Sequence, residues 1–303
     1  MSLPLFPTFK KLELADKEVF EQQTKKFPPY SDYNFVSLWS YNTEDDVTFS
    51  FLNDNLVMKF RDYITNEPFY TFLGTNKVQE TINNLLTLSD TENVMKKLQL
   101  IPEANILTNK EIFDTFLINE DRDNFDYIFS LEKMGKLEGA TYNKQRGWVN
   151  NLMKNYPAIQ ITQLNSNEAT VQQKLIELFQ TWEKNKNTGT DDAVHELIAI
   201  KRLLKDSSHF DLTTVGIFYN NTLIGFSISE YLKNDYSIMH FVKADTNYKG
   251  IYQLLYKETA HAHFEKGAKY LNREQDLGIE GLRQAKESWS PITFLKKYTI
   301  SSR

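Results

Sequence analysis

A chain of 303 residues is long enough for one large domain or two ordinary ones, and its 41% hydrophobic and 14% aromatic content can build cores that fold unaided. Its formal charge of −5 argues against a general nucleic-acid binder, since such domains usually present a strongly basic surface. The chain has no cysteine, which excludes disulfides, thiolate nucleophiles and cysteine-ligated metals. Its chemistry must come from carboxylates, hydroxyls, amines or backbone groups.

No stretch of the sequence approaches the roughly 18 consecutive apolar residues that a membrane-spanning helix needs. Residues 1–11 lack the charged-then-apolar order of a signal peptide. We therefore expect a cytoplasmic protein without a membrane-spanning segment, which leaves a peripheral contact with lipid open.

The first half of the chain predicts a short helix, a β-hairpin, a further strand and a longer helix. Two β-rich runs flank Asn53-Asp54-Asn55, and these residue types tolerate the left-handed backbone of a tight turn. The first helix ends at Pro28-Pro29, because proline lacks a backbone donor. In chain order the expected elements are helix 16–24, strands 47–52, 56–60 and 69–73, and helix 77–88.

The same order recurs in the second half, where two strands flank Asn220-Asn221-Thr222. The two hairpin turns, at Asn53 and Asn220, lie about one ordinary domain apart, so we infer two structurally related halves. The second-half elements are strands 213–219, 223–231 and 236–243, and helix 251–265.

Between the repeats, a helix is expected over 109–117 and a strand over 126–129. The stretch after 129 ends at Pro157, which is the expected boundary between an N-terminal domain, 1–157, and a C-terminal domain, 158–303. That stretch carries a basic cluster made of Lys144, Arg146 and Lys154. The second domain then opens with two helices, one to about 184 and one over 193–205, joined by a polar loop over 185–192.

Two helices, an antiparallel meander, a strand-to-helix crossing and a final strand pair form the layout of an N-acetyltransferase-like (GNAT-like) domain. The predicted fold class is α/β (α+β), with two tandem GNAT-like domains, each a mixed, mostly antiparallel sheet flanked by helices. The first domain is interpreted as a degenerate copy and the second as the one that carries the site.

In such folds, a strand that runs into a helix N-terminus offers unpaired backbone N–H groups and the positive end of the helix dipole to an anion. Here that turn precedes helix 251–265, and Lys249 and Gly250 are the residues expected to face a phosphate. A plain turn is the alternative interpretation.

The densest group of charges lies between 271 and 287. If 269–275 is a strand, its side chains alternate between two faces, and Glu274 and Asp276 share one face with Asn272. If 279–287 is a helix, Arg283 and Lys286 are adjacent on its surface and can meet those carboxylates. Two interpretations remain open: an ion-pair cluster that fastens the terminal helix, or a site whose carboxylates orient basic groups toward a phosphate or an acyl carbonyl.

From 283 to the end, the chain carries five basic residues and one acidic residue, Glu287. This concentration favours a small anionic partner such as the phosphates of coenzyme A or a tRNA end, with a solvated tail as the alternative. The basic residues are Arg283, Lys286, Lys296, Lys297 and Arg303.

No metal site is predicted. His261 and His263 are two apart on a helix, so they point roughly 200° apart around its axis and cannot bind one ion. His240 is interpreted as a strand residue.

Four stretches give the chain a resemblance to a known family, the phosphatidylglycerol lysyltransferase C-terminal-like domains. They are Tyr30-Ser31-Asp32-Tyr33-Asn34-Phe35 with Leu38-Trp39, the run 121–128, the run 137–146, and the block 272–286 with Ser288, Pro291, Lys297 and Tyr298. The last block is the most specific.

The resemblance implies tandem GNAT-like domains like those of Fem-type transferases, which move an aminoacyl group from aminoacyl-tRNA to peptidoglycan precursors or lipids. By position, Lys249 and Gly250 would contact phosphates or the tRNA end. Glu274 and Asp276 would shape the cleft, and one of them would serve as the base for the acceptor proton. The remaining assignments are Arg283 and Lys286 for the leaving or attacking group and Tyr298, Tyr252 or a backbone N–H for the carbonyl oxygen.

The expected function is therefore acyl or aminoacyl transfer, with acyl-CoA or aminoacyl-tRNA as the co-substrate and an open acceptor. A rival from another class is a non-catalytic protein that holds an anionic metabolite in the second-domain cleft. The fold alone does not decide between them, because similar domains transfer acetyl groups, aminoacyl groups or nothing.

Overall fold

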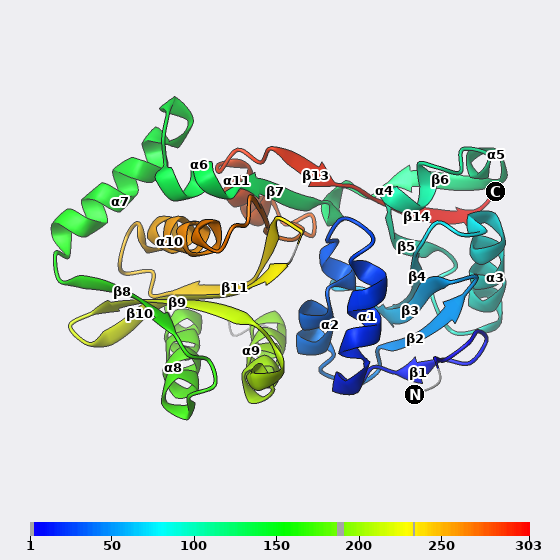
Figure 1. The fold of residues 1–303 in the computed structure, drawn as a ribbon, viewed down its shortest axis with the longest axis horizontal. Helices are drawn as coiled ribbons and strands as arrows, with labels where there is room; N and C mark the ends of the chain where they lie inside the picture. Colours follow the sequence, from blue (N-terminus) through cyan, green and yellow to red (C-terminus); the bar gives the residue numbers. More distant parts are fainter. Residues whose placement is uncertain (1–2, 187–190, 233) are drawn as a thin grey trace. The chain divides into compact units, whose positions relative to one another are not determined.

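The computed structural model describes residues 3–186, 191–232 and 234–303. The chain forms two compact units that exchange segments (Figure 1). The first unit runs to Asp126 and adds 275–284 and 294–303; the second comprises Tyr127–Glu274 and 285–293. The points at which the chain passes from one unit to the other differ from Pro157. The domain boundary expected at Pro157 stays a prediction.

The first unit contains the predicted hairpin. Asn53 and Asp54 have φ values of 54° and 61°, which confirms the left-handed turn expected between the two strands. A four-stranded sheet has the order β1-β2-β3-β4, with antiparallel pairing throughout. Its strands are β1 (Lys10–Lys11), β2 (Thr48–Leu52), β3 (Asn55–Arg61) and β4 (Pro68–Leu73).

Two of three helices of the first unit, over 17–24 and 78–91, were predicted from the sequence, and the helix over 35–41 was not. In α3, Ile82 and Leu85 are fully buried in the core of this unit. The helices are α1 (Lys17–Thr24), α2 (Phe35–Tyr41) and α3 (Val78–Thr91). Short 3-10 helices lie at Leu14–Asp16, Ser31–Tyr33, Arg122–Asn124, Ala140–Tyr142 and Ser207–His209.

A second sheet of the first unit corrects one prediction. The helix expected over 109–117 is limited to the single turn α5 (Ile112–Thr115), and Phe116 begins a strand instead. That strand pairs with the C-terminal strand, so long-range pairing overrides the local helical pattern. The sheet has the order β5-β14-β6, formed by β5 (Leu98–Pro102), β14 (Lys297–Ser302) and β6 (Phe116–Glu120), and α4 (Glu103–Ile106) follows β5.

Most residues of the seven-stranded sheet belong to the second unit. Its order is β13-β7-β12-β11-β10-β9-β8, and β11 and β12 are paired in parallel. The strands are β7 (Asp126–Ser130), β8 (Ile159–Leu164), β9 (Leu212–Tyr219), β10 (Thr222–Leu232), β11 (Tyr236–Ala244), β12 (Tyr270–Asn272) and β13 (Thr293–Leu295).

Helices cover both faces of this sheet (Figure 1). α8 and α9 pack on one face, and α10 with α6 and α7 covers the other. The expected polar loop between α8 and α9 falls partly on residues 187–190, which lie outside the described residues. The helices are α6 (Leu131–Lys136), α7 (Asn143–Asn155), α8 (Ala169–Lys186), α9 (Asp191–Lys205), α10 (Ile251–Glu265) and α11 (Glu280–Glu287).

The predicted recurrence of hairpin, strand and helix is confirmed as β2-β3-β4-α3 and β9-β10-β11-α10. After each long helix comes one more strand, β5 or β12. β5 pairs with β14 from the end of the chain, and β12 pairs with β7 from the first half. These two exchanges explain why the compact units are interleaved along the sequence. The fold is mixed α/β with mainly antiparallel sheets.

Candidate functional site

The parallel pair β11 and β12 separates at the point where the charged block begins. Hydrogen-bonded pairing ends at Ile238 and Asn272, whereas β11 continues to Ala244. The strand predicted over 269–275 is therefore too long. It stops at Asn272, and two residues later Glu274 adopts a left-handed φ of 57°, which departs from regular strand geometry.

His240 stands in a β-bulge. Ile228 of β10 pairs with Phe241, and the next residue, Ser229, pairs with Met239, so His240 has no residue opposite it. A bulge bends the strand and redirects the extra side chain, and bulges are frequent beside active sites. The bulge shifts the alternation of side chains along β11 by one residue at this point.

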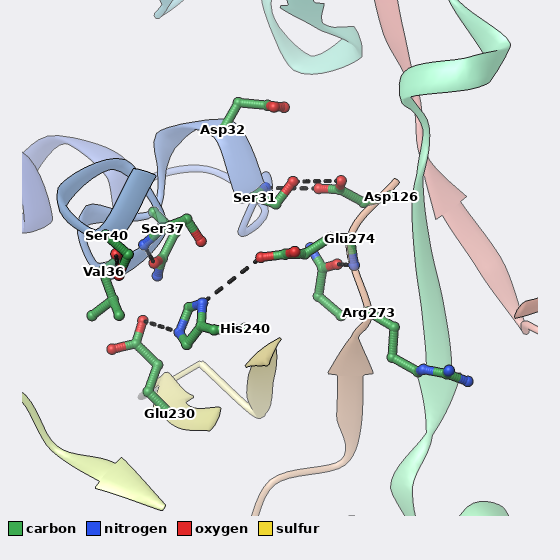
Figure 2. Close-up of polar contacts among 12 residues, drawn as sticks. Ser31, Asp32, Val36, Ser37, Ser40, Asp126, Glu230, His240, Arg273 and Glu274 are labelled. Atoms are coloured by element: carbon green, nitrogen blue, oxygen red, sulfur yellow. Dashed lines mark hydrogen bonds and ion pairs between the residues drawn. The ribbon is translucent and has the colours of Figure 1, made fainter. Parts of the chain in front are cut away.

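His240 is flanked by two carboxylates (Figure 2). Its Nδ1 lies 3.7 Å from Glu274 Oε1, and its Nε2 lies 3.8 Å from Glu230 Oε1. The imidazole side chain is 1% exposed, the Glu230 side chain 10% and the Glu274 side chain 22%. Glu274 is thus the member of this group that solvent reaches most readily.

This carboxylate–imidazole–carboxylate arrangement can accept a proton at Glu274 and pass charge through His240 toward Glu230. The separations exceed those of direct hydrogen bonds, and catalytic contacts often shorten only when substrate is bound. Nowhere in the described part of the chain do three His, Asp or Glu side chains gather as they would around a metal ion.

Asp276 occupies a different environment within the first unit. Its carboxylate is fully buried and accepts hydrogen bonds from Arg283 at 2.8 and 3.0 Å and from Arg122 at 3.2 Å. The bonds to Asp276 and to Asp123 raise the pKa of the Arg283 guanidinium above its usual range. For this pair the ion-pair interpretation describes the geometry, because both carboxylate oxygens are engaged by cations.

Arg273 and Lys286 take part in a separate group of contacts. The buried Arg273 guanidinium lies 3.8 Å from the ring centroid of Tyr256 and 6.0 Å from that of Trp289, and desolvation lowers its pKa. Lys286 Nζ donates a 2.6 Å hydrogen bond to the backbone carbonyl of Arg273. This bond joins Lys286 to the backbone one residue before Glu274.

A family model for "Phosphatidylglycerol lysyltransferase, C-terminal" matches residues 24–301. The chain belongs to this family. No significant match was found among curated proteins. A conserved protein of unknown function from Bacteroides thetaiotaomicron VPI-5482 is 26% identical, with a TM-score of 0.86 and 100% of both chains covered.

Two further solved structures share the fold of this phosphatidylglycerol lysyltransferase C-terminal family member. One is the C-terminal domain of a putative lysylphosphatidylglycerol synthetase from Agrobacterium fabrum, with a TM-score of 0.64, 10% identity and coverage of 95% of this chain and 92% of that one. The other is L-PGS from Bacillus licheniformis, with a TM-score of 0.62, 12% identity and coverage of 97% and 94%.

The turn before α10 is closely packed in this family member. Gly250 has a φ of 99°, and a Cβ there would lie 2.6 Å from the carbonyl oxygen of Trp148 in α7. Lys249 is exposed, and burial raises the pKa of the Tyr252 phenol. α7 therefore approaches the face of the turn where Gly250 was expected to receive a phosphate.

The C-terminal basic residues are mostly engaged within the first unit. Lys297 is fully buried and contacts Asp32 and Asp126, the latter at 2.8 Å. Lys296 pairs with Glu120 at 2.6 Å. Arg303 bonds the carbonyl of Phe113 at 2.7 Å, so the tail is neither a uniformly solvated segment nor an open basic patch.

Tyr298, one of the groups expected to serve the carbonyl oxygen, lies in the three-stranded sheet of the first unit. Its hydroxyl is 3.4 Å from Glu103 and from Glu120, and burial raises its pKa to about 12. Glu274 belongs to the other compact unit.

The basic cluster of α7 has one member with a structural contact. Arg146 donates hydrogen bonds to the carbonyls of Leu137 and Gly139 and to Asn143, which ties the helix to the preceding loop. Lys144 and Lys154 are exposed.

Glu230 and the buried cluster around Lys297 were not predicted from the sequence. Glu230 has no signal of its own, because only the register of β10 on β11 brings it to His240. The Lys297 cluster did have a signal in the sequence. Its members fall within the stretches that carry the family resemblance, and they are Ser31, Asp32, Asp126 and Lys297. In the structure, Ser31 donates to Asp126 at 2.6 Å through its hydroxyl and at 2.7 Å through its backbone N–H.

Proposed function

We propose that this chain transfers an aminoacyl group from aminoacyl-tRNA to a hydroxyl or amine acceptor, and that it is built from two tandem GNAT-like domains. The observation that carries the proposal is the arrangement of Glu274, His240 and Glu230 beyond the point where β11 and β12 part. In parallel-strand folds, reactive groups gather beyond the carboxyl ends of diverging strands.

In the proposed reaction, the acceptor oxygen or nitrogen attacks the carbonyl carbon of the aminoacyl ester. Glu274 takes the acceptor proton, and His240 supports the change of charge on that carboxylate. The ester C–O bond then breaks, and the tRNA hydroxyl leaves with a proton returned from the same relay. Asp276 is the weaker candidate for the base, because Arg122 and Arg283 already hold its carboxylate.

The surroundings of Gly250 favour a tRNA donor over acyl-CoA. A coenzyme A diphosphate would need the α10 N-terminus open, and the Trp148 carbonyl approaches that turn from α7. Lys249 remains exposed and is the residue of the pair that can still meet a phosphate.

Family membership supports a lipid acceptor, since the family description names phosphatidylglycerol. The described residues contain no helix long and apolar enough to cross a membrane. In this proposal the acceptor headgroup is therefore met at a membrane surface or in solution.

A transfer assay tests the donor and the acceptor together. The purified chain is incubated with tRNA charged with radiolabelled amino acids and with phosphatidylglycerol vesicles, and label is counted in the lipid extract. Parallel reactions contain labelled acetyl-CoA in place of tRNA, or an amine in place of lipid. Label moved from tRNA to an acceptor supports the proposal. Transfer from acetyl-CoA alone contradicts the donor assignment. Binding of charged tRNA with no turnover under any condition favours the rival, a non-catalytic binding protein.

A further inference from the structure

The residue that carries the proposed base sits in a turn held by its own neighbours. Asn272, the last residue of β12, is fully buried, and its Oδ1 accepts a 2.6 Å hydrogen bond from the Glu274 N–H. This side-chain bond to the backbone two residues later closes an Asx-type turn. It also holds Glu274 at a φ of 57°, a conformation that glutamate seldom adopts.

The same turn is attached to its surroundings from two sides. On one side, the Arg273 N–H donates to the Tyr127 carbonyl at 3.0 Å, and the Tyr127 N–H donates to the Glu274 carbonyl at 3.2 Å. On the other, Lys286 of α11 donates to the Arg273 carbonyl at 2.6 Å and lies over the Tyr127 ring at 5.7 Å. The backbone of 272–274 is thus held between β7 and α11.

The Arg273 side chain gives this short segment its orientation. Its guanidinium packs against Tyr256 and Phe129, with centroid distances of 3.8 and 5.1 Å. Figure 2 shows the Arg273 side chain pointing away from Glu274, whose carboxylate points toward His240. A buried anchor on one residue therefore restricts the direction that the next residue can take.

We infer that Asn272 and Lys286 are positioning residues that hold the Glu274 carboxylate against His240. Lys286 acts through the Arg273 carbonyl, and Asn272 acts through the Glu274 N–H. This inference rests on the proposed function, because it names the residues that prepare Glu274 for the reaction. It also replaces the direct role expected for Lys286 from the sequence.

A positioning role makes different demands on the two side chains. At Lys286 it needs a donor of sufficient length, so arginine is expected to substitute and methionine is not. At Asn272 it needs a side-chain acceptor, which alanine lacks. Loss of either contact lets the left-handed turn relax toward commoner backbone angles and moves the carboxylate away from the imidazole.

The experiment compares Asn272→Ala, Lys286→Met, Lys286→Arg and Glu274→Gln with Lys205→Met, a change at an exposed lysine at the end of α9. Two readouts need no substrate: the ring NMR signals of His240 at a fixed pH, assigned among five histidines, and the hydrogen-exchange rate of the Glu274 amide. The third readout is kcat and KM in the transfer assay. Cooperative thermal unfolding of each variant shows that it is folded.

Positioning predicts that Asn272→Ala and Lys286→Met displace the His240 signals in the direction seen in Glu274→Gln and speed exchange of the Glu274 amide. It also predicts that they lower kcat by about 100-fold at nearly constant KM, since a shift of about 1 Å has effects of this size. Lys286→Arg is expected to restore all three readouts, and Lys205→Met to match the wild type.

Unchanged His240 signals and unchanged amide exchange in folded Asn272→Ala and Lys286→Met would overturn the inference, whatever their activity. Failure of the proposed function has a different signature. In that case Glu274→Gln keeps full transfer activity, while the NMR and exchange readouts still report whether the turn depends on Asn272 and Lys286.

Discussion

Glu274 Oε1 lies 3.7 Å from His240 Nδ1, and each residue reaches that position through a break in regular strand geometry. His240 is the extra residue of a β-bulge, and Glu274 has a left-handed backbone two residues beyond the end of β12. Irregularities of this kind persist where the surrounding structure enforces them, and they concentrate at functional sites. Two independent departures that converge on one contact are the strongest structural argument for a site here.

The backbone conformation of Glu274 leads us to expect that one substitution at this residue raises the stability of the fold and removes its activity. Asparagine tolerates a φ of 57° better than glutamate does, so Glu274→Asn is expected to raise the free energy of unfolding by up to about 1 kcal/mol. The same change removes the proposed base and should abolish transfer. Urea denaturation of the wild type, Glu274→Asn and Glu274→Gln measures the first effect, with Glu274→Gln as the variant that keeps the strain. A Glu274→Asn variant less stable than Glu274→Gln would contradict this account of the turn.

We expect part of the acid sensitivity of the fold to come from the buried imidazole ring of His263. Burial, with a smaller effect of the Lys266 charge, lowers the pKa of His263 from 6.5 to about 3, and its Nε2 lies 2.7 Å from Ser229 Oγ. Between these values the unfolded chain binds a proton that the folded chain does not. The contribution of His263 is therefore complete above pH 6.5 and is lost as the pH falls toward 3, by at most about 1.4 kcal/mol per pH unit.

Replacement of His263 by glutamine keeps a group that can bond Ser229 and removes the titration. Urea unfolding at pH 7 and pH 4.5 is expected to show a smaller loss of stability on acidification in His263→Gln than in the wild type. Equal losses in the two proteins would mean that the ring does not titrate as its burial implies.

Removal of the single charge of Lys297 is expected to cause a large loss of stability. Lys297 is fully buried with Asp32 and Asp126, and burial raises the pKa of the Asp32 carboxyl. Lys297→Met leaves these carboxylates without their cation, at an expected cost of about 3–5 kcal/mol in the free energy of unfolding. The double variant Lys297→Met/Asp32→Asn should recover part of that loss, because it buries one fewer acid. Chemical denaturation of Lys297→Met, Asp32→Asn and the double variant checks this, and a loss in the double variant equal to the sum of the two single losses would argue against coupling.

Local signals in the sequence predicted the local structure well. The asparagines at 53 and 220 mark both hairpin turns, and each has the left-handed φ that such turns need. Helical spacing found α3, which buries an apolar stripe along its own length, and the helix expected over 251–265 is α10. These features depend on residues within a few positions of one another.

Features that depend on how strands pair were missed. Phe116 joins a strand only because β14 lies beside it, and His240 leaves the alternation only because β10 and β11 shift register. Of the residues grouped in 272–286, Glu274 reaches His240, Asp276 meets Arg283, and Lys286 binds a backbone carbonyl. Strand alternation placed the two carboxylates on one face, and the left-handed turn at Glu274 ended that alternation.

The most direct test of the central claim is the single-turnover rate of aminoacyl transfer from charged tRNA in the wild type, Glu274→Gln and Glu265→Gln. Glu265 is an exposed acid at the end of α10 in the same compact unit, so its variant controls for loss of a carboxylate in general. We predict that Glu274→Gln lowers the rate by about 10²–10⁴-fold, the usual contribution of a general base, while Glu265→Gln retains the wild-type rate. Equal rates in all three folded proteins would contradict the assignment of Glu274 as the base.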